Sequence, residues 1–176
     1  MVSFIQKVDS GITQPLCFLF PHTGFFDLFF SFFSLKGDSF LIWVLILFFL
    51  VLFEERRDKR FILYFFASFA ITALVSNFFL KNIFQRVRPY TLLEKSIAVC
   101  PTDFSFPSGH AATAVAAATI LSAFDKKRKW FYYTVALLIS FSRIYLGCHY
   151  VVDIVGGALV GWLISKGVLF LVKRIT

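Results

Sequence analysis

The chain has 176 residues, of which 59% are hydrophobic, only 16% are charged and 26 are phenylalanine. Soluble domains carry about 25% charged residues, so this composition excludes a water-soluble protein and indicates one polytopic membrane domain over residues 1–176. The net charge of +8 does not indicate a nucleic-acid partner, because the basic residues gather in short clusters after apolar segments. Such clusters are typical of the cytoplasmic loops of membrane proteins.

Residues 1–35 are expected to form an interfacial segment. Phe4, Val8 and Ile12 recur at helical spacing beside Lys7 and Asp9, which predicts an amphipathic helix in the outer membrane interface. The apolar stretch 16–35 contains Pro21, His22, Gly24 and Asp27, and is expected to be a short re-entrant or tilted piece. A sixth span remains an open alternative here. No cleavable signal sequence is expected, because the basic start and small-residue site are missing.

Residues 36–176 are expected to form the transmembrane core. Five apolar stretches predict five transmembrane helices, so the expected fold class is an all-α polytopic membrane bundle. They run from about 39 to 53, 61 to 80, 108 to 124, 130 to 147 and 151 to 172. Ten of the 18 basic residues form three clusters: Arg56, Arg57, Lys59 and Arg60; Lys126, Lys127, Arg128 and Lys129; and Lys173 and Arg174. With these clusters in the cytoplasm, segments 81–107 and 143–153 both lie on the outer side.

The first polar group on the outer side is Lys81-x6-Arg88-Pro89. Lys81 and Arg88 are two helical turns apart and would share one face if the second helix continued to Arg88. Two cations on one face without adjacent acids suit an anionic ligand. Snorkelling of both side chains to the membrane interface is the alternative interpretation.

The second group, Pro107-Ser108-Gly109-His110, opens an alanine-rich span. The N-terminus of a helix presents unpaired N–H groups that bind phosphate. Ser108 can add a hydroxyl donor, Gly109 permits close backbone approach, and His110 stands where a proton donor to a phosphate ester is needed. An N-cap serine followed by an interfacial histidine is the alternative.

The third group is Ser142-Arg143-x5-His149-x3-Asp153. His149 and Asp153 lie on one helical face if the fifth helix begins near His149. An aspartate that accepts a hydrogen bond from one ring nitrogen leaves the other nitrogen basic, and this pairing is expected to raise the pKa of His149. Arg143 offers a planar fork for phosphate oxygens. A structural His–Asp pair is the alternative.

Together the three groups closely resemble the signature of the type 2 phosphatidic acid phosphatase (PAP2) family, which shares its site with vanadium haloperoxidases. That signature is Lys-x6-Arg-Pro, Pro-Ser-Gly-His and Ser-Arg-x5-His-x3-Asp, and residues 81–89, 107–110 and 142–153 match every position. The resemblance covers about residues 25–172. It implies an integral membrane lipid phosphatase of the bacterial plasma membrane, with its site on the extracytoplasmic side.

The resemblance also implies a role for each matching residue. His149 would attack phosphorus to form a phosphohistidine, Asp153 would orient His149, and His110 would protonate the leaving oxygen. The equatorial phosphate oxygens would be held by Lys81, Arg88, Ser108, the Gly109 amide and Arg143. No metal or other cofactor is implied, and the sequence has no clustered carboxylates of the kind that a magnesium site needs.

The partner is expected to be a membrane lipid with a phosphorylated head group, and no obligatory protein partner is indicated. Candidate substrates are phosphatidylglycerophosphate, undecaprenyl diphosphate and the 1-phosphate of lipid A, between which the sequence does not choose. A catalytically inactive protein of the same fold that binds or transports lipid phosphates is the alternative function. The oligomeric state is not predicted.

Cys17, Cys100 and Cys148 make an odd number without metal-binding spacing. All three are expected to be small packing residues. A Cys100–Cys148 bridge outside the membrane is the alternative.

Overall fold

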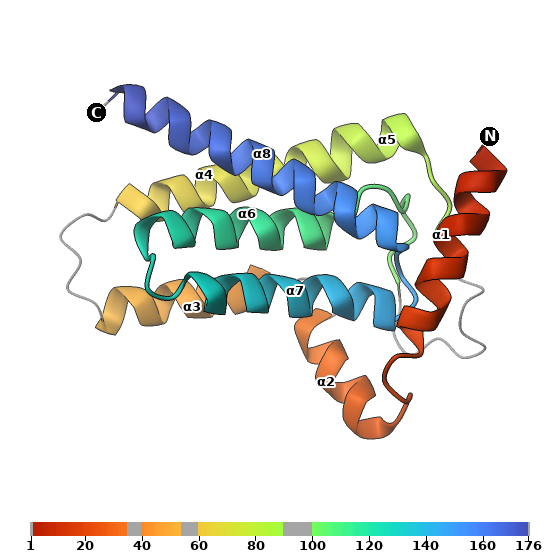
Figure 1. The fold of residues 1–176 in the computed structure, drawn as a ribbon. Coiled ribbons are helices and arrows are strands. Elements are labelled where there is room, and N and C mark those ends of the chain that lie inside the picture. The colour runs from red at the N-terminus through yellow and green to blue at the C-terminus, as the bar shows by residue number, and fades with distance from the viewer. Residues whose placement is uncertain (1, 35–39, 54–59, 90–99, 176) are drawn as a thin grey trace.

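The structure is a computed structural model that describes residues 2–34, 40–53, 60–89 and 100–175. Within these ranges every regular element is helical, as the sequence predicts. Figure 1 shows a bundle whose long helices run roughly along one axis. They are α3 (Phe40–Phe53), α4 (Arg60–Leu74), α6 (Gly109–Phe124), α7 (Lys129–Tyr145) and α8 (Val151–Ile175). Helix α6 packs against α4, α7 and α8 and therefore forms the centre of the bundle.

The long helices follow the predicted apolar stretches closely. Two helical stretches are long and apolar enough to cross a membrane, Arg60–Phe84 and Val151–Val172. Three shorter helices are also apolar, over residues Gly24–Ser34, Phe40–Leu52 and Gly109–Phe124. Five membrane crossings therefore remain a prediction, while the all-helical architecture is confirmed for the described residues.

Small residues bring α6 and α8 into close contact. Ala112 and Ala116 of α6 are fully buried. A Cβ atom on Gly161 would overlap the carbonyl oxygen of Ala112, and one on Gly157 would overlap that of Ser108. Gly157 and Gly161 have the spacing of the Gly-x3-Gly motif, which lets helix backbones approach in membranes. This contact holds the start of α6 against the start of α8.

The second long helix contains a π-helical segment and then stops. Helix α4 continues into the π-helical η2 (Val75–Leu80) and the short α5 (Lys81–Phe84). Gln85 ends it in the left-handed region with φ 46°. The condition under which Lys81 and Arg88 would share a helical face is therefore not met, because residues 85–89 lie outside the helix.

The N-terminal residues form two helices across one end of the bundle. Helix α1 (Val2–Cys17) contacts α7 and α8, and α2 (Gly24–Ser34) packs on α7 (Figure 1). The predicted amphipathic helix is present, and its polar side faces the protein. Val8 and Ile12 are 47% and 51% exposed, whereas Asp9 and Thr13 are buried. The stretch expected to be re-entrant or tilted contains α2, a regular helix with its own packing partner.

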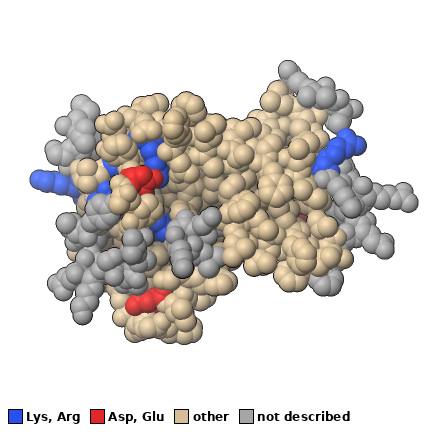
Figure 2. Space-filling model, turned by 180° about the vertical axis from the view of Figure 1, so that it is seen from behind, with Lys and Arg blue, Asp and Glu red and all other residues tan. Residues whose placement is uncertain are grey.

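Charged side chains lie at the two ends of the molecule. Figure 2 shows lysine and arginine gathered at both ends and an uncharged belt between them. The turn between α6 and α7, which carries the cluster 126–129, lies at one end, and the residues after α5 and before α6 lie at the other (Figure 1). An apolar belt between charged ends is the surface expected of a bundle that sits in a bilayer.

Candidate active site

A cavity of about 320 Å³ lies at the end of the bundle that carries the predicted site residues. Its walls come from α4, η2, α5, α6 and the loops at that end, and are formed by Phe69, Ala73, Asn77, Lys81, Arg88, Pro101, Asp103, Gly109, His110, Thr113 and His149. Five predicted site residues are among them: Lys81, Arg88, Gly109, His110 and His149. Ser108, Arg143 and Asp153 are buried behind this wall.

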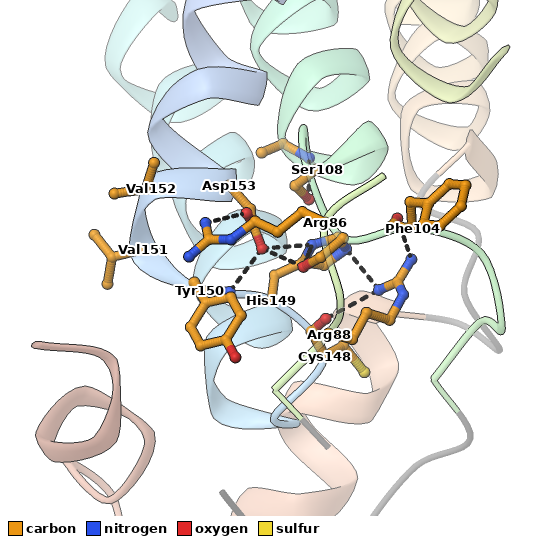
Figure 3. Close-up of polar contacts among 12 residues, drawn as sticks. Arg86, Arg88, Phe104, Ser108, Cys148, His149, Tyr150, Val151, Val152 and Asp153 are labelled. Atoms are coloured by element: carbon orange, nitrogen blue, oxygen red, sulfur yellow. Dashed lines mark hydrogen bonds and ion pairs between the residues drawn. The ribbon is translucent and has the colours of Figure 1, made fainter. Parts of the chain in front are cut away.

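His149 lies in the turn between α7 and α8 and is 1% exposed. Its Nε2 lies 3.0 Å from Nη1 of Arg88 (Figure 3). A guanidinium can only donate, so Nε2 carries the lone pair and Nδ1 carries the hydrogen; this tautomer is assigned from the partners. His149 thus turns an unprotonated nitrogen toward Arg88 at the cavity wall.

Asp153 faces the other side of the His149 ring. Its Oδ2 lies 3.4 Å from His149 Nδ1 and accepts a hydrogen bond of 2.9 Å from the backbone N–H of Tyr150. Helix α8 begins at Val151, the start expected for the fifth span, so Asp153 in its first turn meets a residue just before the helix. The pairing that the sequence predicts is present, although the two residues do not share a helical face.

Ser105 is a member of this group that the sequence analysis missed. Its hydroxyl donates to Asp153 Oδ2 and lies 3.5 Å from His149 Nδ1. Ser105 is completely buried, and its backbone N–H donates to the carbonyl of Arg86 at 2.7 Å. It therefore connects the Asp153 carboxylate to the loop before α6.

The pKa of His149 shifts in the direction opposite to the one expected from Asp153. Burial holds this pKa well below the usual 6.5, and the neighbouring cations, led by Arg88, lower it further. The expected rise is wrong because burial and the charges of Arg88, Arg143 and Lys81 outweigh the opposing charge of Asp103. His149 is consequently neutral at pH 7, which is the form that can attack.

Arg88 and Lys81 meet although they are not on one helix. Arg88 donates to the carbonyls of Asp103 and Cys148 at 2.8 and 2.9 Å. The Asp103 carboxylate forms ion pairs with both Arg88 and Lys81. Burial raises the pKa of Asp103, but the hydrogen bond and charge of Lys81 and the charge of Arg88 outweigh burial and hold it below 3.8. Asp103 therefore stays ionised and forms an ion pair with each of the two cations.

Arg143 brings unpaired donors into the protein interior. It is 1% exposed, and its Nη1 donates to the hydroxyl of Ser34 on α2. Its Nε and Nη2 have no hydrogen-bond partner among the described residues. A buried guanidinium with free donors suits an anion.

The start of α6 has the geometry of a capped helix N-terminus. The Ser108 hydroxyl accepts from the N–H of Ala111 at 3.5 Å, and the Ser108 N–H donates to the Asp153 carbonyl at 2.9 Å. A Cβ atom on Gly109 would overlap the side chain of Asn77, so a larger residue there would require Asn77 to move. His110 lines the cavity, and its Nε2 has no hydrogen-bond partner among the described residues.

The family model of the PAP2 superfamily matches residues 61–176. The chain belongs to the PAP2 superfamily. Undecaprenyl-diphosphatase of Sulfolobus acidocaldarius is 30% identical over 76% of the chain and 63% of its own length. Phosphatidylglycerophosphatase B of Bacillus subtilis is 35% identical over 53% of the chain and 48% of its own length. The PAP2 chain thus spans less than two thirds of these two relatives.

A longer match and two solved structures extend the likeness. Lipid A 4′-phosphatase of Bacteroides thetaiotaomicron is 31% identical over 92% of the PAP2 chain and 75% of its own length. The transmembrane PAP2 type phosphatidylglycerolphosphate phosphatase of Bacillus subtilis superposes with a TM-score of 0.71 at 27% identity, covering 98% of this chain and 88% of that one. The structure of Aquifex aeolicus LpxE superposes with a TM-score of 0.67 at 30% identity, covering 90% of this chain and 93% of that one.

A disulfide lies beside the PAP2 site. Cys100 and Cys148 are bridged with a Cα–Cα distance of 5.4 Å, while Cys17 is free and buried. The interpretation of all three cysteines as packing residues is wrong for this pair. Spacing could not reveal it, because 48 residues separate the two. The bridge fixes the residue directly before His149.

No group of three or more His, Cys, Asp or Glu side chains in the described part of the PAP2 chain has an arrangement that could hold a metal ion. The site is built instead from cations, backbone donors and two histidines. Independence from metals nevertheless stays a prediction that activity measurements must test.

Proposed function

We propose that this chain is an integral membrane lipid phosphatase that transfers a phosphoryl group to His149 and then to water, without a metal. The orientation of the His149 ring carries this proposal. Its Nε2 lies 3.0 Å from Arg88, beside a cavity that Lys81 also lines. A neutral imidazole with its lone pair among cations is placed to attack the phosphorus of a bound phosphate. A protein that only binds lipid phosphates has no need of this orientation.

Two displacement steps complete the reaction. In the first, a bond forms between Nε2 of His149 and phosphorus, the bond to the lipid oxygen breaks, and that oxygen takes a proton from His110. In the second, water attacks phosphorus, the phosphorus–nitrogen bond breaks, and His110 takes the proton from the water. Phosphate and the dephosphorylated lipid leave, and both histidines regain their starting states.

The cations and backbone donors stabilise charge on the transferring group. Lys81, Arg88 and the free donors of Arg143 supply positive charge, and the start of α6 at Ser108 and Gly109 supplies the helix dipole. Asp153 stabilises the positive charge that develops on the His149 ring. Loss of one such preorganised donor typically costs about 10²–10³ in rate.

The substrate class follows from the relatives. They are named for undecaprenyl diphosphate, phosphatidylglycerophosphate and the 4′-phosphate of lipid A. We take phosphatidylglycerophosphate, undecaprenyl diphosphate and a phosphate of lipid A as the candidate substrates of this chain. All three present a phosphate at a membrane surface, where the cavity at the end of the bundle can receive it.

Two features support a site on the extracytoplasmic side of the membrane. The Cys100–Cys148 bridge lies at the site, and disulfides persist in oxidising compartments. The basic cluster 126–129 lies at the opposite end of the bundle (Figure 1), and such clusters stay in the cytoplasm.

The test is to trap the phosphoenzyme. Purified protein in detergent with excess EDTA is mixed with ³²P-labelled lipid phosphate and quenched within milliseconds. We expect an acid-labile, base-stable phosphoramidate on the wild type and none on His149→Ala. His22→Ala, which removes a histidine ring outside the cavity, serves as the control and should retain the label. Substantial phosphate release by His149→Ala, or a requirement for added magnesium, would refute the mechanism.

A further inference from the structure

The Asp153 carboxylate has a second charged partner on the side away from His149. Its Oδ1 lies 2.7 Å from Nη1 of Arg86, while Oδ2 faces the His149 ring (Figure 3). Asp153 is fully buried, so neither contact is screened by water. Arg86 is not a position of the PAP2 signature described above.

Arg86 is held between two carboxylates from distant parts of the chain. Its Nη2 lies 2.7 Å from Oδ2 of Asp9 on helix α1, and Asp9 is 1% exposed. The guanidinium also lies over the ring of Tyr150, 4.2 Å from its centre. A bidentate fork with a stacked face leaves the guanidinium little freedom to rotate. The direction of the Asp153 carboxylate is therefore fixed by a contact that begins on α1.

The same helix supplies hydrogen-bond acceptors to the first turn of α8. The N–H of Val151 donates to the Thr13 hydroxyl at 3.1 Å, and the N–H of Val152 donates to Asp9 Oδ1 at 3.2 Å. The first N–H groups of a helix have no partner within the helix and need external acceptors. Asp153 belongs to this turn, so α1 fixes both its backbone and its carboxylate.

We propose that Arg86, clamped by Asp9, is a positioning residue that directs the Asp153 carboxylate at His149, so that helix α1 is a working part of the catalytic site. This inference rests on the proposed role of His149 as the nucleophile. Arg86 does not touch the cavity, and it acts on His149 only through Asp153. Asp9 and Thr13 also lie outside residues 61–176, which the family model matches.

A positioning role predicts a particular pattern in the kinetics. Arg86→Gln and Asp9→Asn should lower kcat about 10–100-fold, as is usual when the partners that orient a reactive group are lost, and should leave KM nearly unchanged. Arg86→Gln also removes the cation that offsets Asp153, so the pKa of His149 should rise and the acidic limb of the pH profile should move to higher pH. Arg86→Lys keeps the positive charge but not the bidentate guanidinium. It should therefore bring the acidic limb of the pH profile closer to its wild-type position than it brings kcat to its wild-type value.

Three further variants separate a positioning role from a purely stabilising one. The double variant Asp9→Asn/Arg86→Gln should be no slower than Arg86→Gln alone, because both residues act along one path. Lys7→Gln removes a charge from the exposed side of α1 and should leave kcat and the pH profile unchanged. Thr13→Val removes one acceptor for α8 and should lower the melting temperature without moving the acidic limb.

The deciding measurement does not need turnover. The chain has three histidines, so ¹⁵N-histidine NMR in detergent can follow the His149 ring, with His149→Gln giving the assignment. We expect a raised His149 pKa in Arg86→Gln relative to wild type and Lys7→Gln. An unchanged His149 pKa with an unchanged pH profile would overturn the positioning role. If Arg86→Gln raises the His149 pKa but the wild type releases no phosphate, the proposed function is refuted while the positioning of Asp153 by Arg86 is supported.

Discussion

His110 lines the cavity with an Nε2 that has no hydrogen-bond partner among the described residues. A group that protonates the leaving oxygen contributes about 10²–10⁴ in rate, but only where the leaving group is a poor one. His110→Ala should therefore slow hydrolysis of an alkyl lipid phosphate far more than hydrolysis of a nitrophenyl phosphate. The measurement is the ratio of the two activities in wild type and variant. An unchanged ratio would leave His110 as a phosphate ligand only.

Asp103 pairs with the two cations that are proposed to bind phosphate. Its carboxylate pairs with Lys81 and Arg88, while Arg88 is also held by the backbone carbonyls of Asp103, Phe104 and Cys148. Asp103→Asn should keep Arg88 in place and leave more positive charge for an anion. We expect the inhibition constants of inorganic phosphate and vanadate to fall several-fold, as measured by steady-state kinetics. Weaker inhibition would mean that the carboxylate is needed to hold the cations.

The signature residues could be predicted from the sequence, but several of their partners could not. Lys81, Arg88, His110 and His149 stand out because polar residues next to apolar spans are costly and therefore informative. Ser105 and Arg86 carry no such signal, since both lie in a polar loop and their partner Asp153 is 48 and 67 residues away. Pairings at that range depend on how the helices pack, which a local pattern does not contain.

At the scale of elements, the contact between α6 and α8 depends on glycine. Gly161→Ala would push a methyl group into the carbonyl of Ala112, whereas a Cβ on Gly167 meets nothing within 4 Å. Overpacking of this kind costs about 1–3 kcal/mol, and it would move the start of α6 that carries His110. Gly161→Ala should lower both the melting temperature and kcat. Gly167→Ala, the matched control in the same helix, should be neutral or slightly stabilising, since alanine forms helices better.

Equal losses in both glycine variants would mean that helix flexibility, and not close packing, is what Gly161 provides.

The long helices themselves were predictable, because the apolar stretches of the sequence set their bounds. The π-helical η2 and the early stop at Gln85 were not, since neither changes the hydropathy of the segment. η2 carries Asn77 into the cavity wall, and single π-helical turns are common at functional sites.

At the scale of the whole molecule, the two charged ends predict opposite accessibility. Thr102 is exposed beside the site, and Lys127 is exposed at the other end. In a Cys17→Ala background, which keeps the Cys100–Cys148 bridge, Thr102→Cys should react with a membrane-impermeant maleimide in intact cells. Lys127→Cys should react only after permeabilisation. The reverse pattern would move the site, and with it the substrate, to the inner leaflet.

The basic clusters predict an orientation of the bundle in the membrane, which the accessibility measurement tests, but the sequence did not reveal how the N-terminal part assembles. Residues 90–99 of the expected outward loop 90–106 lie outside the described residues, as do residues 54–59 of the basic loop 54–60. The amphipathic pattern of α1 indicated a helix with an apolar outer side, and Val8 and Ile12 are exposed on it. It gave no sign that Asp9 and Thr13 would serve as acceptors for another helix, because their targets are 143 and 138 residues away.

The hydrogen bonds between α1 and α8 also determine when the site can form during protein synthesis. Asp9 and Thr13 are synthesised before Val152 and Val151, which follow them by 143 and 138 residues. Contacts between such distant residues form late in folding. The turn that carries His149 is therefore completed only after α8 has been made and has met α1. On the proposed mechanism, a nascent chain that still lacks α8 should be unable to hydrolyse lipids.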